Sequence, residues 1–181
     1  MSFPRIVTAN WDDPSVIGIE GYVAKGGYEG LRRALAMGSP ELIDLVKASG
    51  LRGRGGAGFP TGVKWSFVPQ DIGKPTYVVA NFDESEPGTF NNREIVEREP
   101  HRFLEGLEIA AYAVNSHSAF IYCRGEFLWP GQVLAGAIRD VYAHGVFGGS
   151  VLGSGFALGV VLHRGAGAYI CGEETALLSS L

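Results

Sequence analysis

A glycine-rich loop is the first part of this sequence whose residue types could do chemistry. Residues 51–62 contain five glycines and two arginines, and no apolar periodicity runs through them. Because glycine has no Cβ, the backbone N–H groups of such a loop can approach a ligand closely. Arg52, Arg54 and Lys64 add positive charge. These features suit a phosphate or pyrophosphate, and a plain flexible surface loop is the alternative.

This loop fits no standard nucleotide-binding motif in its context. Residues 53–58 match G-x-G-x-x-G formally, but a predicted helix rather than a strand precedes them. The Gly-Lys-Ser/Thr ending of a P-loop is missing from the sequence. Three aromatic residues lie beside the loop, and each could stack on a planar ring: Phe59, Trp65 and Phe67. We expect Phe59 to face a ligand and Trp65 to pack in the core.

An acidic turn is the second candidate. Polar side chains crowd together where a short apolar run ends, at Asn81, Asp83, Glu84, Ser85 and Glu86. An amide and carboxylates can bond the edge of a heterocycle or the hydroxyls of a ribose. A solvated acidic turn is the simpler interpretation of the same residues.

A second glycine loop covers residues 165–172 and leads into Glu173 and Glu174. Its glycines again allow the backbone to approach a ligand. The two carboxylates lie in the first turn of a predicted helix, where the helix dipole alone would favour them. The four histidines are scattered along the chain and no CxxC pair occurs, so neither a catalytic triad nor a metal site is predicted.

The elements that must position these loops alternate between strands and helices. Short apolar runs predict strands at 76–81, 119–123 and 158–163. Helical spacing predicts helices over 28–37 and 39–49, and others beginning at 100, 130 and 173. In the helix from 100, the apolar stripe is Phe103, Leu104, Leu107, Ala110, Ala111 and Val114. Residues 1–20 look irregular.

The alternation predicts an α/β fold. We expect a Rossmann-like parallel sheet with helices on both faces, preceded by a short helical N-terminal segment. Both candidate loops that follow strands would then share one edge of the sheet, where such folds bind ligands. The last predicted helix is short and lacks a C-cap residue, so we expect the chain to be truncated at its C-terminus.

Composition excludes several other classes of protein. Apolar residues make up 46% of the 181 residues and charged residues 19%, which argues against disorder. The net charge is −4 and no run of five like charges occurs, which argues against a nucleic-acid surface. Residues 141–163 lack Asp, Glu, Lys and Arg, but glycines break them too often for a membrane helix. Cys123 and Cys171 are expected to be buried and reduced.

Four motifs occur in the order found in one protein family. They are residues 49–62 (SGLRGRGGAGFPTG) with 64–67 (KWSF), residues 83–89 (DESEPGT), residues 124–126 (RGE) and residues 164–177 (RGAGAYICGEETAL). Residues 20–181 thereby resemble the NADH-binding flavoprotein subunit of respiratory complex I, which is the F subunit of NADH-quinone oxidoreductase. That family includes the diaphorase subunits of NAD-linked hydrogenases and formate dehydrogenases.

The resemblance implies two bound cofactors, FMN and NAD(H), with hydride passing from NADH to the flavin. Positions that match the family's flavin contacts are Gly53, Arg54, Gly55, Asn81, Asp83, Ser85, Gly172 and Glu173. Positions that match its NADH contacts are Gly56, Phe59, Lys64, Phe67, Glu86 and Glu174, of which Glu86 and Glu174 would be the catalytic pair. No metal ligand is implied within this chain; a [4Fe–4S] cluster is expected in a missing C-terminal part.

The resemblance also sets expectations about organisation and partners. Residues 1–50 would form an irregular and helical N-terminal segment and residues 51–181 a partial FMN/NADH-binding α/β domain. Electrons would pass to iron–sulfur clusters and finally a quinone, through other subunits of a complex I-like or diaphorase assembly. The protein would lie in the cytoplasm or on the cytoplasmic face of a membrane, without inserting into it and without binding nucleic acid.

Two departures and two alternatives accompany this interpretation. Phe82 stands where the family has a small residue, and we expect it to crowd the edge of the flavin. Asn91 and Asn92 replace a Lys-Asp pair. One alternative function is a diaphorase subunit of a hydrogenase or formate dehydrogenase. The other is an inactive, truncated remnant that only binds partner subunits.

Overall fold

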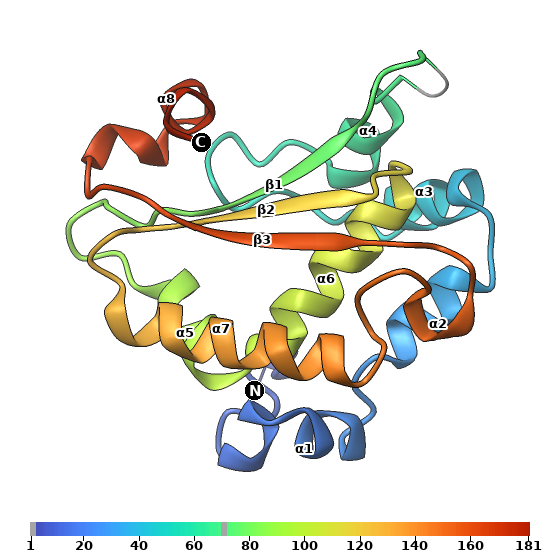
Figure 1. Ribbon diagram of the computed structural model, residues 1–181, viewed down its shortest axis with the longest axis horizontal. Coiled ribbons are helices and arrows are strands. Elements are labelled where there is room, and N and C mark those ends of the chain that lie inside the picture. The colour runs from blue at the N-terminus through green and yellow to red at the C-terminus, as the bar shows by residue number, and fades with distance from the viewer. Residues whose placement is uncertain (1–2, 70–71) are drawn as a thin grey trace.

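Three parallel strands form the central sheet of the computed structural model, which describes residues 3–69 and 72–181 (Figure 1). They are β1 (Tyr77–Phe82), β2 (Ser118–Cys123) and β3 (Gly159–Arg164), in the order β1-β2-β3. Each lies within one residue of its predicted bounds. The register pairs Phe82 with Cys123 and Cys123 with Arg164, so the three carboxyl ends lie at one edge.

Helices cover the two faces of this sheet unequally. α6 (Pro100–Ala113) and α7 (Leu128–Ala143) pack on one face, where alternate strand residues such as Ile121 are fully buried. On the other face Leu177 of α8 (Glu174–Ser180) packs with Tyr122. Figure 1 shows α8 above the sheet, and α6 and α7 below it. The predicted α/β class with helices on both faces is confirmed.

The N-terminal segment contributes helices to the α6 side of the molecule. It holds the 3-10 helix η1 (Pro14–Ile17), α1 (Ile19–Ala24), α2 (Glu29–Leu35) and α3 (Ser39–Ala48). Tyr22 and Leu31 belong to the same apolar core as the sheet. The sequence predicted no helix before residue 28, so η1 and α1 were both missed. η1 begins where the Asp13 carboxylate accepts a hydrogen bond from the N–H of Ser15 at 3.0 Å.

Two further short helices were not predicted. α4 (Thr61–Ser66) begins inside the segment predicted as a glycine loop. The apolar residues of α5 (Asn91–Arg98) are Ile95 and Val96, so its sequence carries almost no apolar stripe, and only Val96 is buried. Its first turn is held from outside, because the Glu84 carboxylate accepts the N–H groups of Asn92 and Arg93. Such tertiary capping leaves no periodic signal in the helix itself.

As the glycines in this segment predict, residues 141–163 do not form one long helix. They contain the end of α7, an irregular stretch with the 3-10 helix η2 (Val151–Gly153), and most of β3. Throughout the described residues, none of the helices combines the length and the apolarity needed to cross a bilayer. Cys123 and Cys171 are both buried free cysteines, as predicted.

Candidate functional site

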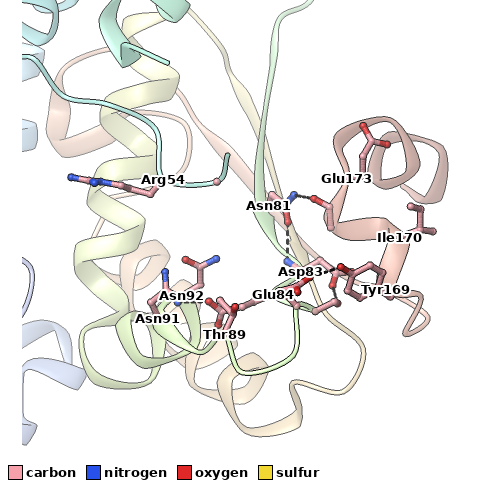
Figure 2. Close-up of a pocket in the computed structure, with 14 residues that line it drawn as sticks. Arg54, Asn81, Asp83, Glu84, Thr89, Asn91, Asn92, Tyr169, Ile170 and Glu173 are labelled. Atoms are coloured by element: carbon pink, nitrogen blue, oxygen red, sulfur yellow. Dashed lines mark hydrogen bonds between the residues drawn. The ribbon is translucent and has the colours of Figure 1, made fainter. Parts of the chain in front are cut away.

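The carboxyl edge of the sheet brings the candidate loops together. The acidic turn follows β1 directly, and the second glycine loop follows β3 and ends in the 3-10 helix η3 (Tyr169–Gly172). Figure 2 shows Asn81 and Asp83 facing the η3 segment, with Arg54 of the first glycine loop on the opposite side of a cleft. The predicted sharing of one sheet edge is therefore confirmed.

The first cleft has a volume of about 610 Å³ and lies between the acidic turn and η3. Its predicted site residues are Arg54, Gly55, Asn81, Asp83, Ser85, Glu86, Gly172 and Glu173. Glu84 of the predicted acidic turn also lines it, and five further lining residues were not singled out as site residues: Thr89, Asn91, Asn92, Tyr169 and Ile170. Thr89, Tyr169 and Ile170 lie within the motifs that carry the family resemblance, and Asn91 and Asn92 are the departure from the family pattern, so the sequence did carry signals for this wall.

The second cleft, of about 780 Å³, lies between the first glycine loop and α8. Its predicted site residues are Gly53, Gly55, Gly56, Phe59, Lys64, Asn81 and Glu174. Gly55 and Asn81 line both clefts, so the two spaces adjoin. Phe67 lies outside both linings, and its ring centroid is 6.1 Å from that of Phe59. Trp65, expected in the core, is partly buried and also lines this cleft.

The Asn81 side chain joins the two loops. Its amide nitrogen donates to the carbonyl oxygen of Gly172 at 2.9 Å, and its amide oxygen accepts the N–H of Asp83 at 2.9 Å. A Cβ on Gly172 would lie 3.2 Å from the carbonyl oxygen of Asp83, so the glycine allows this close approach. The end of β1 and the end of η3 are therefore held as one unit.

The acidic turn is ordered by specific bonds and is not simply solvated. Asp83 and Glu84 are only 8% and 5% exposed. The Ser85 hydroxyl donates to the Asp83 carboxylate. The Glu86 carboxylate is exposed at the cleft and accepts a hydrogen bond from the Tyr169 hydroxyl. This bond raises the pKa of Tyr169, because removing its proton would place a second negative charge beside Glu86.

The two glutamates after η3 have different environments. Glu173 is the N-cap of α8, and its carboxylate accepts the N–H groups of Thr175 and Ala176 at 3.1 and 3.2 Å. Hydrogen bonds from Thr175 and Ala176 hold the pKa of Glu173 below its usual value. The carboxylate of Glu173 thus caps the N-terminus of α8, whereas Glu174 is exposed and lines the second cleft.

The first glycine loop is fixed at its base and open at its tip. Gly53 donates its N–H to the carbonyl of Phe59 at 3.0 Å, and the Arg52 guanidinium donates to the carbonyl of Gly58 at 3.0 Å. A Cβ on Gly55 or Gly56 would meet no atom within 4 Å. Arg52 is therefore occupied with the loop itself, and the open backbone of Gly55 and Gly56 faces the clefts. This arrangement favours a ligand loop over a flexible one.

Phe82 does not crowd the cleft, so that expectation was wrong. The side chain is 2% exposed and its ring centroid lies 5.2 Å from that of Phe127 and 6.4 Å from that of Phe103. Successive residues of a strand point to opposite faces, so Asn81 on the cleft side places Phe82 on the α6 side. The large residue fills core space beneath the acidic turn.

Gly125 permits close contact between the loops that follow β2 and β3, which leads to a stability prediction. A Cβ on Gly125 would lie 2.5 Å from the carbonyl oxygen of Gly165. We expect Gly125→Ala to lower the free energy of unfolding by about 1–3 kcal/mol, because the backbone must shift. In the control Gly136→Ala, on α7, the new Cβ meets nothing closer than 3.8 Å and a helix gains alanine. Urea unfolding of both variants measures the difference; equal stabilities would contradict it.

Metal chemistry has no candidate centre within the part of the chain that the structure covers. Over residues 3–69 and 72–181, no three His, Cys, Asp or Glu side chains are grouped as a metal site would require. The candidate site is therefore built from glycine backbone, amide, carboxylate, lysine and aromatic groups. The aromatic, amide and carboxylate groups suit a flat ligand with polar edges, and the glycine backbone with Arg54 and Lys64 suits an anionic group on it.

Comparison with known proteins shows the family to which this chain belongs. A family model described as the Nuo51 FMN-binding domain matches residues 46–181. An NADH-quinone oxidoreductase F subunit of Rhizobium meliloti (strain 1021), numbered F 2, is 52% identical over 180 residues, covering 99% of this chain and 43% of that protein. The corresponding F subunit of Streptomyces coelicolor is 54% identical over 176 residues, covering 97% and 39%. The chain thus spans about two fifths of these relatives' length.

Solved structures share the fold as well. The crystal structure of an NAD+-reducing [NiFe]-hydrogenase in the air-oxidized state matches with a TM-score of 0.72 at 29% identity. The match covers 98% of this chain and 27% of the hydrogenase chain. The same kind of hydrogenase in the H2-reduced state matches with a TM-score of 0.69 at 30% identity.

Proposed function

Because this chain belongs to the family of the Nuo51 FMN-binding domain, we propose that it binds FMN and NADH side by side and promotes hydride transfer between them. The observation that carries the proposal is the adjoining pair of clefts, which share Gly55 and Asn81. Both volumes, about 610 and 780 Å³, lie in the range of small-molecule sites. Two ligands in adjoining clefts can be in contact, which hydride transfer requires.

The residues of the first cleft fit FMN. The flavin, when bound, supplies a ring that accepts a hydride and releases electrons singly. The open backbone at Gly55, with Arg54 beside it, offers N–H groups and charge for a phosphate. Asn81 and Asp83 offer polar groups to the edge of a heterocycle. The full set proposed to hold FMN is Gly53, Arg54, Gly55, Asn81, Asp83, Ser85, Gly172 and Glu173.

The residues of the second cleft fit a nicotinamide dinucleotide. Phe59 is half exposed in the loop and offers a ring face for stacking. Lys64 offers a point charge for the pyrophosphate. Glu86 and Glu174, the proposed catalytic pair, both carry exposed carboxylates, Glu86 in the first cleft and Glu174 in the second. Because the clefts adjoin, both carboxylates would orient the ribose and carboxamide groups. The full set proposed for NADH is Gly56, Phe59, Lys64, Phe67, Glu86 and Glu174.

The assembly around this chain is also a proposal. Its relatives among the F subunits of NADH-quinone oxidoreductase favour a complex I-like assembly in which electrons continue to iron–sulfur clusters and a quinone. We place that assembly in the cytoplasm or on the cytoplasmic face of a membrane, with residues 51–181 as the cofactor-binding unit. The likeness to NAD+-reducing [NiFe]-hydrogenase favours a diaphorase subunit as the second candidate. Retention of Lys64, Glu86 and Glu174 argues against an inactive remnant.

Anaerobic reduction of the bound flavin by NADH tests the proposed function. With FMN loaded, we expect NADH to bleach the visible flavin absorbance of the parent protein. Glu174→Gln should slow this reduction or weaken NADH binding, because the substitution keeps the size of the side chain and removes its charge. The fold should persist, since the lost helix-dipole interaction contributes only about 0.3–1 kcal/mol.

Glu41→Gln is the matched control for this variant. Glu41 also lies in the first turn of a helix, α3, and is exposed, but it is not part of either cleft. We expect Glu41→Gln to reduce its flavin at the parent rate. If Glu174→Gln behaves like Glu41→Gln in stopped-flow reduction, Glu174 is only a helix-start carboxylate. If NADH never reduces the parent flavin, the proposed function is wrong.

A further inference from the structure

An arginine at the end of β2 holds the acidic turn from behind. The Arg124 guanidinium donates from Nη1 to the carbonyl oxygen of Glu84 at 2.9 Å. The same guanidinium donates from Nε and Nη2 to the Glu126 carboxylate at 3.1 and 3.3 Å. The backbone N–H of Arg124 donates to the carbonyl of Phe82 at 3.1 Å. One residue thus connects the end of β2 to both the start and the middle of the turn.

Apolar packing keeps this guanidinium in place. Its Cζ lies 5.7 Å from the centroid of the Phe127 ring, and that ring packs on Phe82, directly before the turn. The Arg124 side chain is 28% exposed, less than that of Glu126 at 51%. Arg124 also holds the pKa of Glu126 below its usual value, so the pair stays ionised.

The Glu84 residue is consequently fixed at two points. Its carboxylate accepts the N–H groups of Asn92 and Arg93 at 2.8 and 3.0 Å, and its carbonyl accepts from Arg124. A trans peptide is planar, so fixing the Glu84 carbonyl also fixes the direction of the Ser85 N–H. Ser85 and Glu86 line the first cleft, whereas Arg124 is absent from the lining of both clefts as the described residues form them.

We infer that Arg124 is a positioning residue: it fixes the Glu84–Ser85 peptide and thereby aims Ser85 and Glu86 at the flavin and the dinucleotide. The inference rests on the proposed function for the identity of those ligands. Nothing in the contact between Arg124 and the turn depends on that identity. Arg124 acts through the turn and touches neither proposed ligand.

The geometry requires an arginine rather than any cation. Arg124 uses three nitrogens at once, one toward the Glu84 carbonyl and two toward the Glu126 carboxylate. A planar guanidinium presents such donors in a fixed fork, whereas an ammonium is a single point charge on a flexible stem. Arg124→Lys therefore preserves the charge and loses the fixed direction of the Glu84 carbonyl.

Hydrogen–deuterium exchange on the flavin-free protein measures the positioning directly. In Arg124→Lys we expect the amides of Asp83, Asn92 and Arg93 to exchange about tenfold faster or more, because losing a charged hydrogen bond has that effect on a local equilibrium. Glu126→Gln should give a smaller increase, since the arginine keeps its bond to Glu84. Arg139→Lys is the control, as Arg139 lies on α7, and should leave the turn unchanged.

The flavin-loaded protein supplies the second measurement. We expect Arg124→Lys to raise the Kd for FMN and the Kd for NADH by about tenfold, with urea unfolding showing that the variant is fully folded under the conditions of the titrations. Unchanged exchange in the turn would overturn the inference, and so would faster exchange with both affinities unchanged. If NADH fails to reduce even the parent flavin, the proposed function falls, while amide exchange and FMN affinity still decide the role of Arg124.

Discussion

Replacing Glu108 by leucine will raise the free energy of unfolding near pH 8. It will also flatten the decrease in unfolding free energy that the parent protein shows between about pH 6.5 and 9. Glu108 lies on α6, is 0% exposed, and neither of its carboxylate oxygens has a hydrogen-bond partner in the described residues. Burial first, and then the nearby Glu105 charge, raise the pKa of Glu108 to about 9. The group is therefore held as a neutral acid in the folded protein at neutral pH.

The sign of the pH dependence follows from linkage. Unfolded Glu108 titrates near its ordinary value of 4.5, and folded Glu108 near 9. Between these values the folded state binds more protons, so stability is fully present below 4.5 and is lost as the pH rises toward 9. His101 opposes this loss in the lower part of the range: burial lowers its pKa to about 4, so its contribution to stability is present above about 6.5 and is lost as the pH falls toward 4. The two slopes offset each other below about 6.5, so the net fall in stability is expected between about pH 6.5 and 9.

Two variants separate ionisation from polarity at this position. Glu108→Leu removes the carboxyl group, and we expect it to gain about 1–3 kcal/mol near pH 8, the usual cost of burying an unpaired polar group. Glu108→Gln also cannot ionise, but it keeps an unpaired polar group, so it should flatten the pH profile with a smaller gain. Urea unfolding at several pH values measures both effects. A parent stability that stays constant between pH 7 and 9 would contradict the prediction.

The buried acid also shows where sequence reasoning succeeds and where it stops. Helical periodicity correctly placed α6 and its buried Leu104 and Leu107, because apolar spacing reports the face that packs. It could not place Glu108 in the core, since a glutamate beside Leu107 is usually an exposed partner of the stripe. Its burial arises from tertiary packing, in which the N-terminal segment takes part: Tyr28, itself 2% exposed, has its pKa raised by burial first and then by the charges of Tyr22 and Glu108.

The candidate site was predictable to a greater extent than the packing. The acidic turn and the second glycine loop follow strands, and the strands could be placed because short β-branched runs between turn residues are a strong signal. The hydrogen bonds that hold the site in place could not be predicted from the spacing of residues in the sequence. Tyr169 reaches Glu86, and Arg124 reaches the Glu84 carbonyl, across 83 and 40 positions of sequence. Such contacts are properties of the folded chain, which is why sequence reasoning placed the clefts and missed what holds them.

Lys64→Ala will weaken NADH binding to the flavin-loaded protein by about 10- to 150-fold and will affect FMN binding less. Lys64 lies in the last turn of α4 and lines only the second cleft. A charge-assisted hydrogen bond to a phosphate contributes about 1.5–3 kcal/mol, which converts to that change in Kd. The parent affinity should fall as salt is added, and the variant should lose part of this dependence, because screening acts on the charge that was removed.

Titration of bound-flavin fluorescence with NADH under anaerobic conditions, together with titration of the flavin-free protein with FMN, gives both dissociation constants. Lys25→Ala is the control for Lys64→Ala. Lys25 is an exposed lysine at the C-cap of α1, on the far side of the molecule from α4 (Figure 1), and its variant should bind both ligands like the parent. Lost FMN affinity with unchanged NADH affinity would instead assign Lys64 to the flavin phosphate. The two clefts would then have to exchange ligands, because Lys64 lines only the second of them.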